Sequence, residues 1–215
     1  MSEIVKSRIE DGIGVLTFAE VDRRNVLSPA LVERALAVHQ DFVERGVVAA
    51  VIEAEGEAFC SGRDPLVVRK PDVPPAGAIF INQIETSPIA WVAAVDGDTV
   101  GAGIHLATCC MHVVAGPNAR FRVPELLDGI YPRPVAADLA RIIGPRRTMT
   151  LMLTGDAIAA QDAVDAGLAG ELVASGDVTA RAIERARTIA GLTPELRQAA
   201  RDGWGTRFGT APAAG

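Results

Sequence analysis

Aromatic residues are scarce in this chain of 215 residues: they make up 4% of it, whereas hydrophobic residues make up 49%. A core must therefore be built mainly from Ala, Val, Leu and Ile, and the length favours one domain with a substantial core. We expect residues 1–190 to form that core domain. Residues 191–215 should add a short helix and a tail whose small residues favour disorder.

The chain also lacks an excess of positive charge and any long apolar run. Its net charge is −6 and its pI is about 5.1, which disfavours non-specific binding to nucleic acid. The apolar run near Ile89–Val95 has the length of a strand and is far shorter than a membrane span. The first twelve residues contain no apolar core of a signal peptide. We therefore expect neither nucleic acid nor a membrane as a partner.

Cysteine is the third scarce residue type. The chain has 3 cysteines, Cys60, Cys109 and Cys110, and all of them stand among apolar neighbours. An odd, small number in apolar surroundings is typical of reduced cysteines, so the sequence predicts a cytoplasmic protein.

Apolar strands alternate with helical patterns along the chain, which predicts an α/β fold. Asp11-Gly12 marks a hairpin between two short strands, and Ser28-Pro29 is typical of a helix start. The continuous apolar runs Val47–Ile52 and Ile89–Val95 are typical of strands that are buried on both faces. Residues 53–77 favour a loop, and the chain after Pro132 favours helices, the last of them at 181–190 and 194–201.

Two unusual turns contain glycines in apolar surroundings, one at Ala58–Asp64 and the other at Gly97–Gly103. Glycine allows a close approach of the backbone, and each turn can direct a backbone N–H group at one point. Two converging N–H groups form an oxyanion hole, so these turns predict an enzyme.

From near Ile4 to about Ala190 the sequence resembles the crotonase (enoyl-CoA hydratase/isomerase) superfamily. The resemblance depends on five pieces in family order: Arg24–Ser28, Ala58–Asp64, Gly97–Gly103, Phe121–Pro132 and Leu153–Leu168. It implies a superhelix of ββα turns, here with a shortened C-terminal helical region. It also implies an acyl-CoA substrate that reacts through a thioester enolate.

The resemblance assigns the two oxyanion donors to the backbone N–H groups of Arg63 and Ala102. Gly62 and Gly101, which come just before them, would let the chain approach the substrate. Loss of one such donor typically costs about 3–4 kcal/mol of barrier.

Hydratases of the superfamily use two glutamates, and only the second is present here, as Glu125 after Pro124. His105 stands at the position of the first. The one-glutamate pattern resembles that of double-bond isomerases; hydration with the help of His105 is the next hypothesis. His105 could act as a second base, polarise a water, shape the acyl pocket, or be a buried histidine without a chemical role.

No metal is expected. His105, Cys109 and His112 have a spacing that could suggest a metal-binding face, but His112 should already lie on a strand. We expect no cofactor apart from the coenzyme A of the substrate thioester.

The resemblance places the CoA moiety near the first turn, at Ala58, Cys60, Ser61, Gly62 and Asp64, with Gly101 on the second turn. Several basic residues could bind its phosphates or could be ordinary surface charges. Arg24 is the strongest candidate, and the others are Arg23, Arg63, Arg69 and Lys70.

The chain departs from the superfamily in two further places. Arg133-Pro134-Val135 replaces a glycine-rich turn, so the pocket wall should differ there. Superfamily members usually carry two more helices after the position of Trp204, which help to cover the acyl-CoA. We therefore expect a homo-oligomer, a trimer or hexamer, that covers apolar surface. The alternative is a non-catalytic or accessory subunit that binds a CoA ester, which turnover assays of the chain alone would distinguish.

Overall fold

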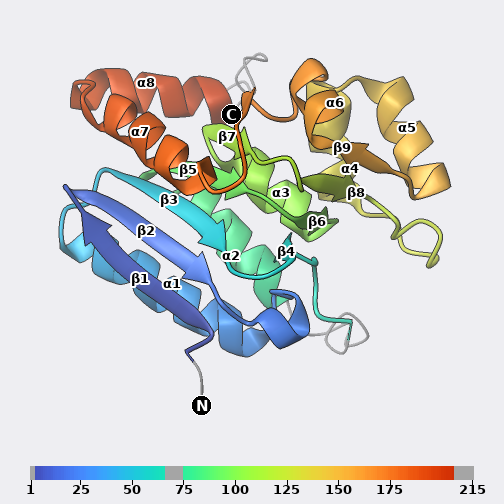
Figure 1. Ribbon diagram of the computed structural model, residues 1–215, viewed down its shortest axis with the longest axis horizontal. Coiled ribbons are helices and arrows are strands. Elements are labelled where there is room, and N and C mark those ends of the chain that lie inside the picture. Colours follow the sequence, from blue (N-terminus) through green and yellow to red (C-terminus); the bar gives the residue numbers. More distant parts are fainter. Residues whose placement is uncertain (1–2, 66–74, 206–215) are drawn as a thin grey trace, which may run out of the picture.

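Two β-sheets with helices packed around them make up residues 3–65 and 75–205, which the computed structural model describes (Figure 1). The larger sheet has the strand order β1-β2-β3-β5-β7-β10, and the smaller has the order β4-β6-β8-β9. The larger sheet comprises β1 (Val5–Glu10), β2 (Ile13–Phe18), β3 (Ala49–Ala54), β5 (Ala90–Val95), β7 (His112–Ala115) and β10 (Glu171–Leu172). The smaller comprises β4 (Ala58–Cys60), β6 (Asp98–Val100), β8 (Arg120–Arg122) and β9 (Ala157–Ala159).

The helices follow the strands along the chain and include a short 3₁₀ turn, η1. In order they are η1 (Val21–Arg23), α1 (Pro29–Glu44), α2 (Ala76–Glu85), α3 (Ala102–Cys109), α4 (Arg133–Ile142), α5 (Pro145–Thr154), α6 (Ala160–Asp165), α7 (Val178–Ala190) and α8 (Pro194–Gly205).

The inner strands of the larger sheet, β2, β3, β5 and β7, are largely buried, which explains their apolar sequences. β1 and β2 form an antiparallel hairpin, and the other neighbours in this sheet are parallel. The apolar face of α7 packs on one side of the sheet, and α1, α2 and α3 cover the other (Figure 1). Every residue of β5 is therefore buried.

Helix α1 begins where the sequence predicts. Ser28 is its N-cap and accepts a hydrogen bond of 3.1 Å from the backbone N–H of Leu31, while Pro29 fills the first helical position. The buried side of the helix, which includes Leu31, Ala35 and Phe42, packs on the sheet.

A repeated unit of two strands and a helix connects the sheets. In β3-β4-α2, β5-β6-α3 and β7-β8-α4, the first strand joins the larger sheet and the second joins the smaller one. The predicted α/β class with ββα turns is therefore confirmed.

Some local expectations were wrong. Residues 53–77 do not form only a loop, because Ala58–Cys60 is a strand that pairs with β6. Strands of three residues, such as β4 and β6, show no periodicity and are stabilised by neighbours that are distant in the sequence. The last two helices are also longer than expected and cover 178–190 and 194–205.

The remaining expectations have mixed outcomes. The 3 cysteines are buried and form no disulfide within the described residues, and His112 lies on β7 as predicted. Within the described ranges, none of the helices is both long and apolar enough to span a membrane. The tail from 206 onward, as well as Arg69 and Lys70, lies outside the described residues.

Candidate active site

A cavity of about 1020 Å³ opens where the smaller sheet meets α3 and α4. Four segments form its walls: the end of η1, the turn after β4, the junction of β6 and α3, and the chain from Pro124 into α4. The lining residues include Arg23, Val26, Ser61, Gly62, Arg63, Val100, Ala102, His105, Glu125, Asp128, Ile130, Tyr131 and Arg133.

The two glycine turns lie against each other on the cavity wall. Gly62 has φ +92° and Gly101 has φ +51°, values that favour glycine. A Cβ atom on Gly62 would lie 2.9 Å from the carbonyl oxygen of Val100 and 3.7 Å from the nitrogen of Ala102. The close packing of the turns therefore requires glycine at position 62.

The backbone N–H groups of Arg63 and Ala102 belong to these turns, and both residues line the cavity. Ala102 is the first residue of α3, where an N–H group has no acceptor within its helix and the helix dipole favours negative charge. Among the described residues, neither N–H group donates a backbone hydrogen bond outside the regular elements. Both predicted donor residues therefore line one cavity, and their role as an oxyanion hole stays a prediction.

The turn after β4 is held by the segment around Asn25. Asn25 is buried, and its side-chain amide donates to the carbonyl oxygens of Glu55 at 2.9 Å and Ala58 at 2.7 Å. In addition, the N–H of Leu27 donates to the carbonyl of Gly62 at 2.8 Å. These bonds fix β4 and the turn after it, which carries the first predicted donor.

Glu125 follows β8 and lines the cavity beside Gly101. A Cβ atom on Gly101 would overlap the Glu125 carboxylate, so the side chain occupies space that only glycine leaves open. Its Oε2 atom is buried and accepts no hydrogen bond among the described residues. Burial raises the pKa of Glu125, and the positive charge of Arg63 opposes this rise. Such a carboxyl group is suited to carry a proton in either direction.

His105 lies one helical turn after Gly101 on α3 and lines the same cavity. Behind it, its Nε2 atom lies 3.2 Å from Oδ2 of Asp138, a side chain of α4 that is 3% exposed. Sequence reasoning did not find Asp138. The available signal was a charged residue next to the apolar positions Val135, Ala136 and Leu139, which are also buried.

The structure brings only part of the predicted CoA-binding set to the cavity. Ser61 and Gly62 line it, whereas Ala58 and Cys60 are buried in β4. Burial raises the pKa of the Cys60 thiol to about 12, so this cysteine is not a nucleophile. Asp64 is also buried and accepts a 2.9 Å hydrogen bond from Arg23.

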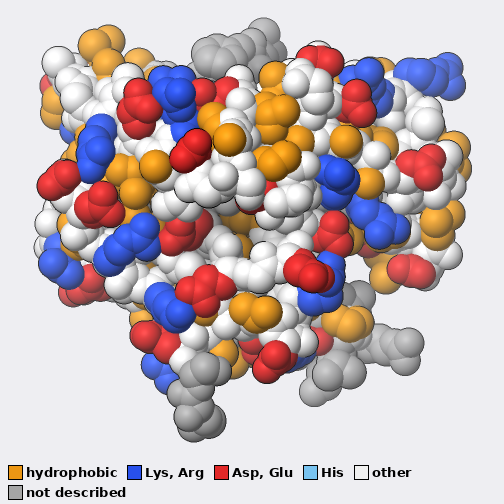
Figure 2. All heavy atoms as spheres, viewed as in Figure 1, with side chains coloured by type: hydrophobic (Ala, Val, Ile, Leu, Met, Phe, Trp, Pro, Cys, Tyr) orange, Lys and Arg blue, Asp and Glu red, His pale blue; other side chains and the backbone are white. Residues whose placement is uncertain are grey.

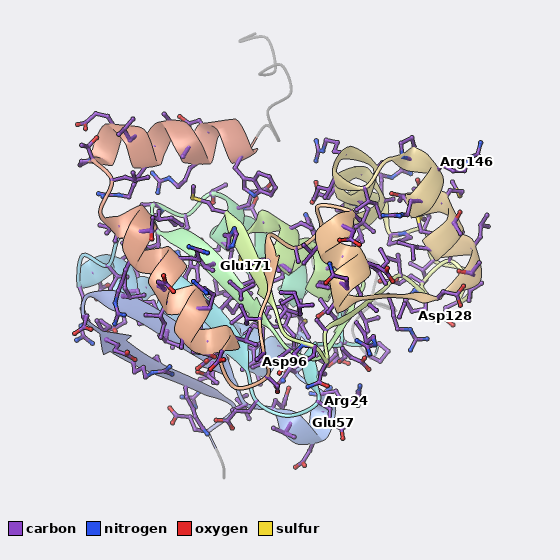
Figure 3. All side chains as sticks on the ribbon, turned by 45° about the horizontal axis from the view of Figure 1, so that its top comes forward. Arg24, Glu57, Asp96, Asp128, Arg146 and Glu171 are labelled. Carbon is purple, nitrogen blue, oxygen red and sulfur yellow. The ribbon has the colours of Figure 1, made fainter. Side chains whose placement is uncertain are left out.

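Arg24 does not line the cavity. Its guanidinium group lies 2.6 Å from a carboxylate oxygen of Asp98 and 3.5 Å from one of Glu57. Figure 3 shows Arg24 beside Glu57, away from Asp128 at the cavity wall. Its role in phosphate binding stays a prediction, and Arg23 is the neighbouring arginine that the structure places at the cavity.

Tyr131 and Arg133 line the cavity, although sequence reasoning named no role for them. The guanidinium carbon of Arg133 lies 5.8 Å from the centre of the Tyr131 ring. The replacement of the glycine-rich turn by Arg133–Val135 predicted a changed pocket wall. It did not predict which side chains would form that wall.

One group of side chains has a spacing that could hold a metal ion. One ligand atom from each of Glu85, His105 and Cys109 lies within 4.8 Å of the others. His112, the third residue considered from the sequence, instead lies 3.2 Å from Glu171.

Comparison with known proteins gives the same family as the motifs. The model of the enoyl-CoA hydratase/isomerase family matches residues 8–207. A 2,3-dehydroadipyl-CoA hydratase of Escherichia coli is 31% identical over 213 residues, which cover 94% of this chain and 81% of that protein. A putative enoyl-CoA hydratase of Thermus thermophilus is 30% identical over 196 residues, covering 85% of this chain and 75% of its own length.

Solved structures show the same fold. The human enoyl coenzyme A hydratase domain-containing protein 3 superposes with a TM-score of 0.86 at 22% identity, over 97% of this chain and 86% of that one. Since the family model spans nearly the whole chain and the relatives cover most of it, the protein belongs to the enoyl-CoA hydratase/isomerase family.

Proposed function

We propose that this enzyme acts on an enoyl-CoA thioester through an enolate that the backbone N–H groups of Arg63 and Ala102 stabilise, with Glu125 as acid and base. The observation that carries the proposal is Oε2 of Glu125, which is buried without a hydrogen-bond partner among the described residues, in the cavity that both donors line. An unpartnered carboxylate oxygen is costly to bury, and a substrate that exchanges a proton with it gives this cost a function.

Isomerisation needs one proton carrier. Glu125 would take a proton from one carbon of the acyl chain and return it to another, while the thioester oxygen carries the negative charge between the steps. Hydration is the second candidate, because His105 also lies on the cavity wall. Isomerisation needs only proton transfers, and hydration needs in addition only water, so we propose that no cofactor is needed apart from the coenzyme A of the substrate.

Two substrates separate these reactions. A 2-enoyl-CoA loses its conjugated absorbance when water adds, whereas a 3-enoyl-CoA gains absorbance when its double bond migrates into conjugation. We expect the purified chain alone to turn over at least one of them. Binding of both thioesters without any turnover would favour the accessory-subunit hypothesis instead.

We also propose that the enzyme is a homo-oligomer, a trimer or hexamer. Large apolar side chains stay exposed on this chain, including Leu127 at 61%, Leu153 at 58% and Leu196 at 56%. Where exposed apolar side chains gather into a large patch, the patch commonly marks an interface. Light scattering of the purified protein tests this proposal, and an active monomer would contradict it.

A cytoplasmic location is proposed because the three cysteines are buried and form no disulfide within the described part of the chain. Acidic and basic side chains alternate over the face drawn in Figure 2, so that face offers no broad basic surface of the kind that nucleic acid requires.

A further inference from the structure

Asp138 and His105 form a pair that the chemistry of Glu125 does not use. His105 lines the cavity, whereas Asp138 lies behind it, 3% exposed, with Oδ2 3.2 Å from Nε2 of the imidazole. A carboxylate is rarely buried on a helix unless it has specific partners, because its desolvation is costly.

The two oxygen atoms of Asp138 face different partners. Arg141, one turn later on α4, donates to Oδ1, which compensates part of the cost of burial. The Thr108 hydroxyl lies 3.4 Å from Oδ2 but 3.0 Å from the carbonyl oxygen of His105. A hydroxyl has one proton, and the carbonyl is the closer acceptor. Of these two neighbours, His105 is the closer to Oδ2, at 3.2 Å.

The carboxylate oxygen of Asp138, 3.2 Å from Nε2, favours the tautomer of the neutral imidazole that carries its proton on this nitrogen. The proton is then on Nε2, and Nδ1 carries the lone pair that can accept a proton. Titratable side chains near the ring in the described part of the chain include Glu85 of α2 and Cys109 of α3, each with a ligand atom within 4.8 Å of a ligand atom of His105, and Glu125, which lines the same cavity.

We propose that Asp138 is a positioning residue that orients His105 as the base for a water molecule attacking the enoyl-CoA. This proposal rests on the proposed function and selects hydration as the reaction that the cavity is equipped to perform. A carboxylate that orients an imidazole base is a recurrent arrangement in enzymes that activate a hydroxyl or water.

The proton balance of the reaction requires two groups. As the water oxygen bonds to C3, one of its protons moves to His105, and the π electrons of the C2=C3 bond move into the thioester enolate. Glu125 then donates a proton to C2, which completes a 3-hydroxyacyl-CoA. The imidazolium returns its proton to solvent and Glu125 takes one up, so the enzyme is regenerated without any further reactant.

Asp138→Asn tests the proposal, because it keeps the size of the side chain but removes the negative charge beside Nε2. We expect hydration to fall by about 10²–10⁴-fold with little change in KM, while double-bond migration by Glu125 stays within a few-fold. Asp138→Glu should recover part of the hydration. In a His105→Ala background, Asp138→Asn should cause no further loss of hydration, because the two residues act as one unit.

A spectroscopic measurement tests the positioning without depending on turnover. The ¹⁵N chemical shifts of the imidazole report which nitrogen carries the proton, and the chain has only 3 histidines to assign. We expect neutral His105 to carry it on Nε2 in the natural protein and to lose this preference in Asp138→Asn. The same tautomer in both proteins, or equal losses of hydration and isomerisation accompanied by a lower Tm, would overturn the proposal.

Failure of the proposed function looks different. If the tautomer depends on Asp138 but neither enoyl-CoA is turned over, the contact is real and the role of His105 as a base for enoyl-CoA hydration is rejected.

Discussion

Two glutamates, Glu53 and Glu125, are both partly buried, but their surroundings differ. Glu53 lies on β3 and accepts hydrogen bonds from Thr17 at 2.6 Å, Thr179 at 2.5 Å and Arg8 at 2.9 Å. Burial would raise the pKa of Glu53, but these donors outweigh burial and lower it. At Glu125, burial dominates and raises the pKa, while Oε2 accepts no hydrogen bond among the described residues.

The contrast separates a carboxylate that stabilises the fold from one that is available for chemistry. Glu53 ties β2, β3 and α7 together, and its hydrogen-bonding capacity is taken up by the protein. Glu125 keeps a free acceptor atom in a cavity at the cost of some stability. Functional groups are often held in this way, in an environment that the folded state would not otherwise favour.

The largest expected effect is the loss of turnover in Glu125→Gln. The amide cannot exchange a proton, so the rate should fall by about 10²–10⁴-fold while the affinity for the CoA ester stays similar. Steady-state rates with both enoyl-CoA substrates, together with ligand binding, measure this loss.

Glu53→Gln is the matched control, because it removes a partly buried carboxylate remote from the cavity lining. Turnover should persist in that variant. An unchanged rate in Glu125→Gln would remove Glu125 from the mechanism.

The next largest effect is expected at Gly62, in the turn that carries the predicted oxyanion donor Arg63. In Gly62→Ala, the new Cβ would lie 2.9 Å from the Val100 carbonyl oxygen, at a φ of +92° that disfavours alanine. The turns must move apart, so we expect a loss in kcat of about 10²–10³-fold, as for removal of one oxyanion donor.

Gly12→Ala provides the control for backbone strain. Gly12 has φ +81°, but a Cβ atom there would meet nothing within 4 Å. Gly12→Ala should therefore lower the stability of the protein without changing kcat. Similar rates in the two variants would show that the spacing of the turns at Gly62 does not matter.

Much of the fold could be predicted from the sequence, because its signals are local. Ser28-Pro29 begins α1, Asp11-Gly12 forms the first hairpin, and the apolar run near Ile89–Val95 forms a strand buried on both faces. The smaller sheet could not be found in this way. Its strands β4 and β6 have three residues each, and their pairing exists only once the ββα units stack.

The candidate site also combines features that local sequence predicts with features that depend on distant contacts. The glycine turns and Glu125 belong to recognisable motifs, and residues of these motifs line one cavity. Asp138 lies on α4, outside these motifs. Its contact with His105 exists only because α4 packs against α3. Arg24 also illustrates the limit, since its pairing with Asp98 joins positions that are 74 residues apart.

A smaller effect is expected on stability in Glu53→Gln. The variant leaves Thr17, Thr179 and Arg8 with a weaker acceptor, so the free energy of unfolding should fall by about 1–3 kcal/mol. Urea unfolding measures it. Glu55→Gln is the control, because Glu55 is 46% exposed and its ion pair with Lys6 should contribute at most about 1 kcal/mol. Equal losses in both variants would show that the Glu53 network adds nothing to an ordinary surface pair.

The smallest effect is a difference in how pH changes these stabilities. The pKa of Glu53 is lower in the folded protein than in the unfolded chain, so its contribution is fully present above the unfolded pKa. That contribution disappears as the pH falls through the folded pKa. The stability difference between the natural protein and Glu53→Gln should therefore shrink in acid.

Glu125 should behave in the opposite way. Its pKa is raised in the folded protein, so the folded state binds more protons than the unfolded chain between the ordinary and the raised pKa. The natural protein should lose stability relative to Glu125→Gln as the pH rises through this window. Urea unfolding of all three proteins between acid and neutral pH would give two difference curves with opposite slopes. Curves with the same slope would mean that the two carboxylates do not differ as the structure indicates, and that Glu125 is not held in a costly state.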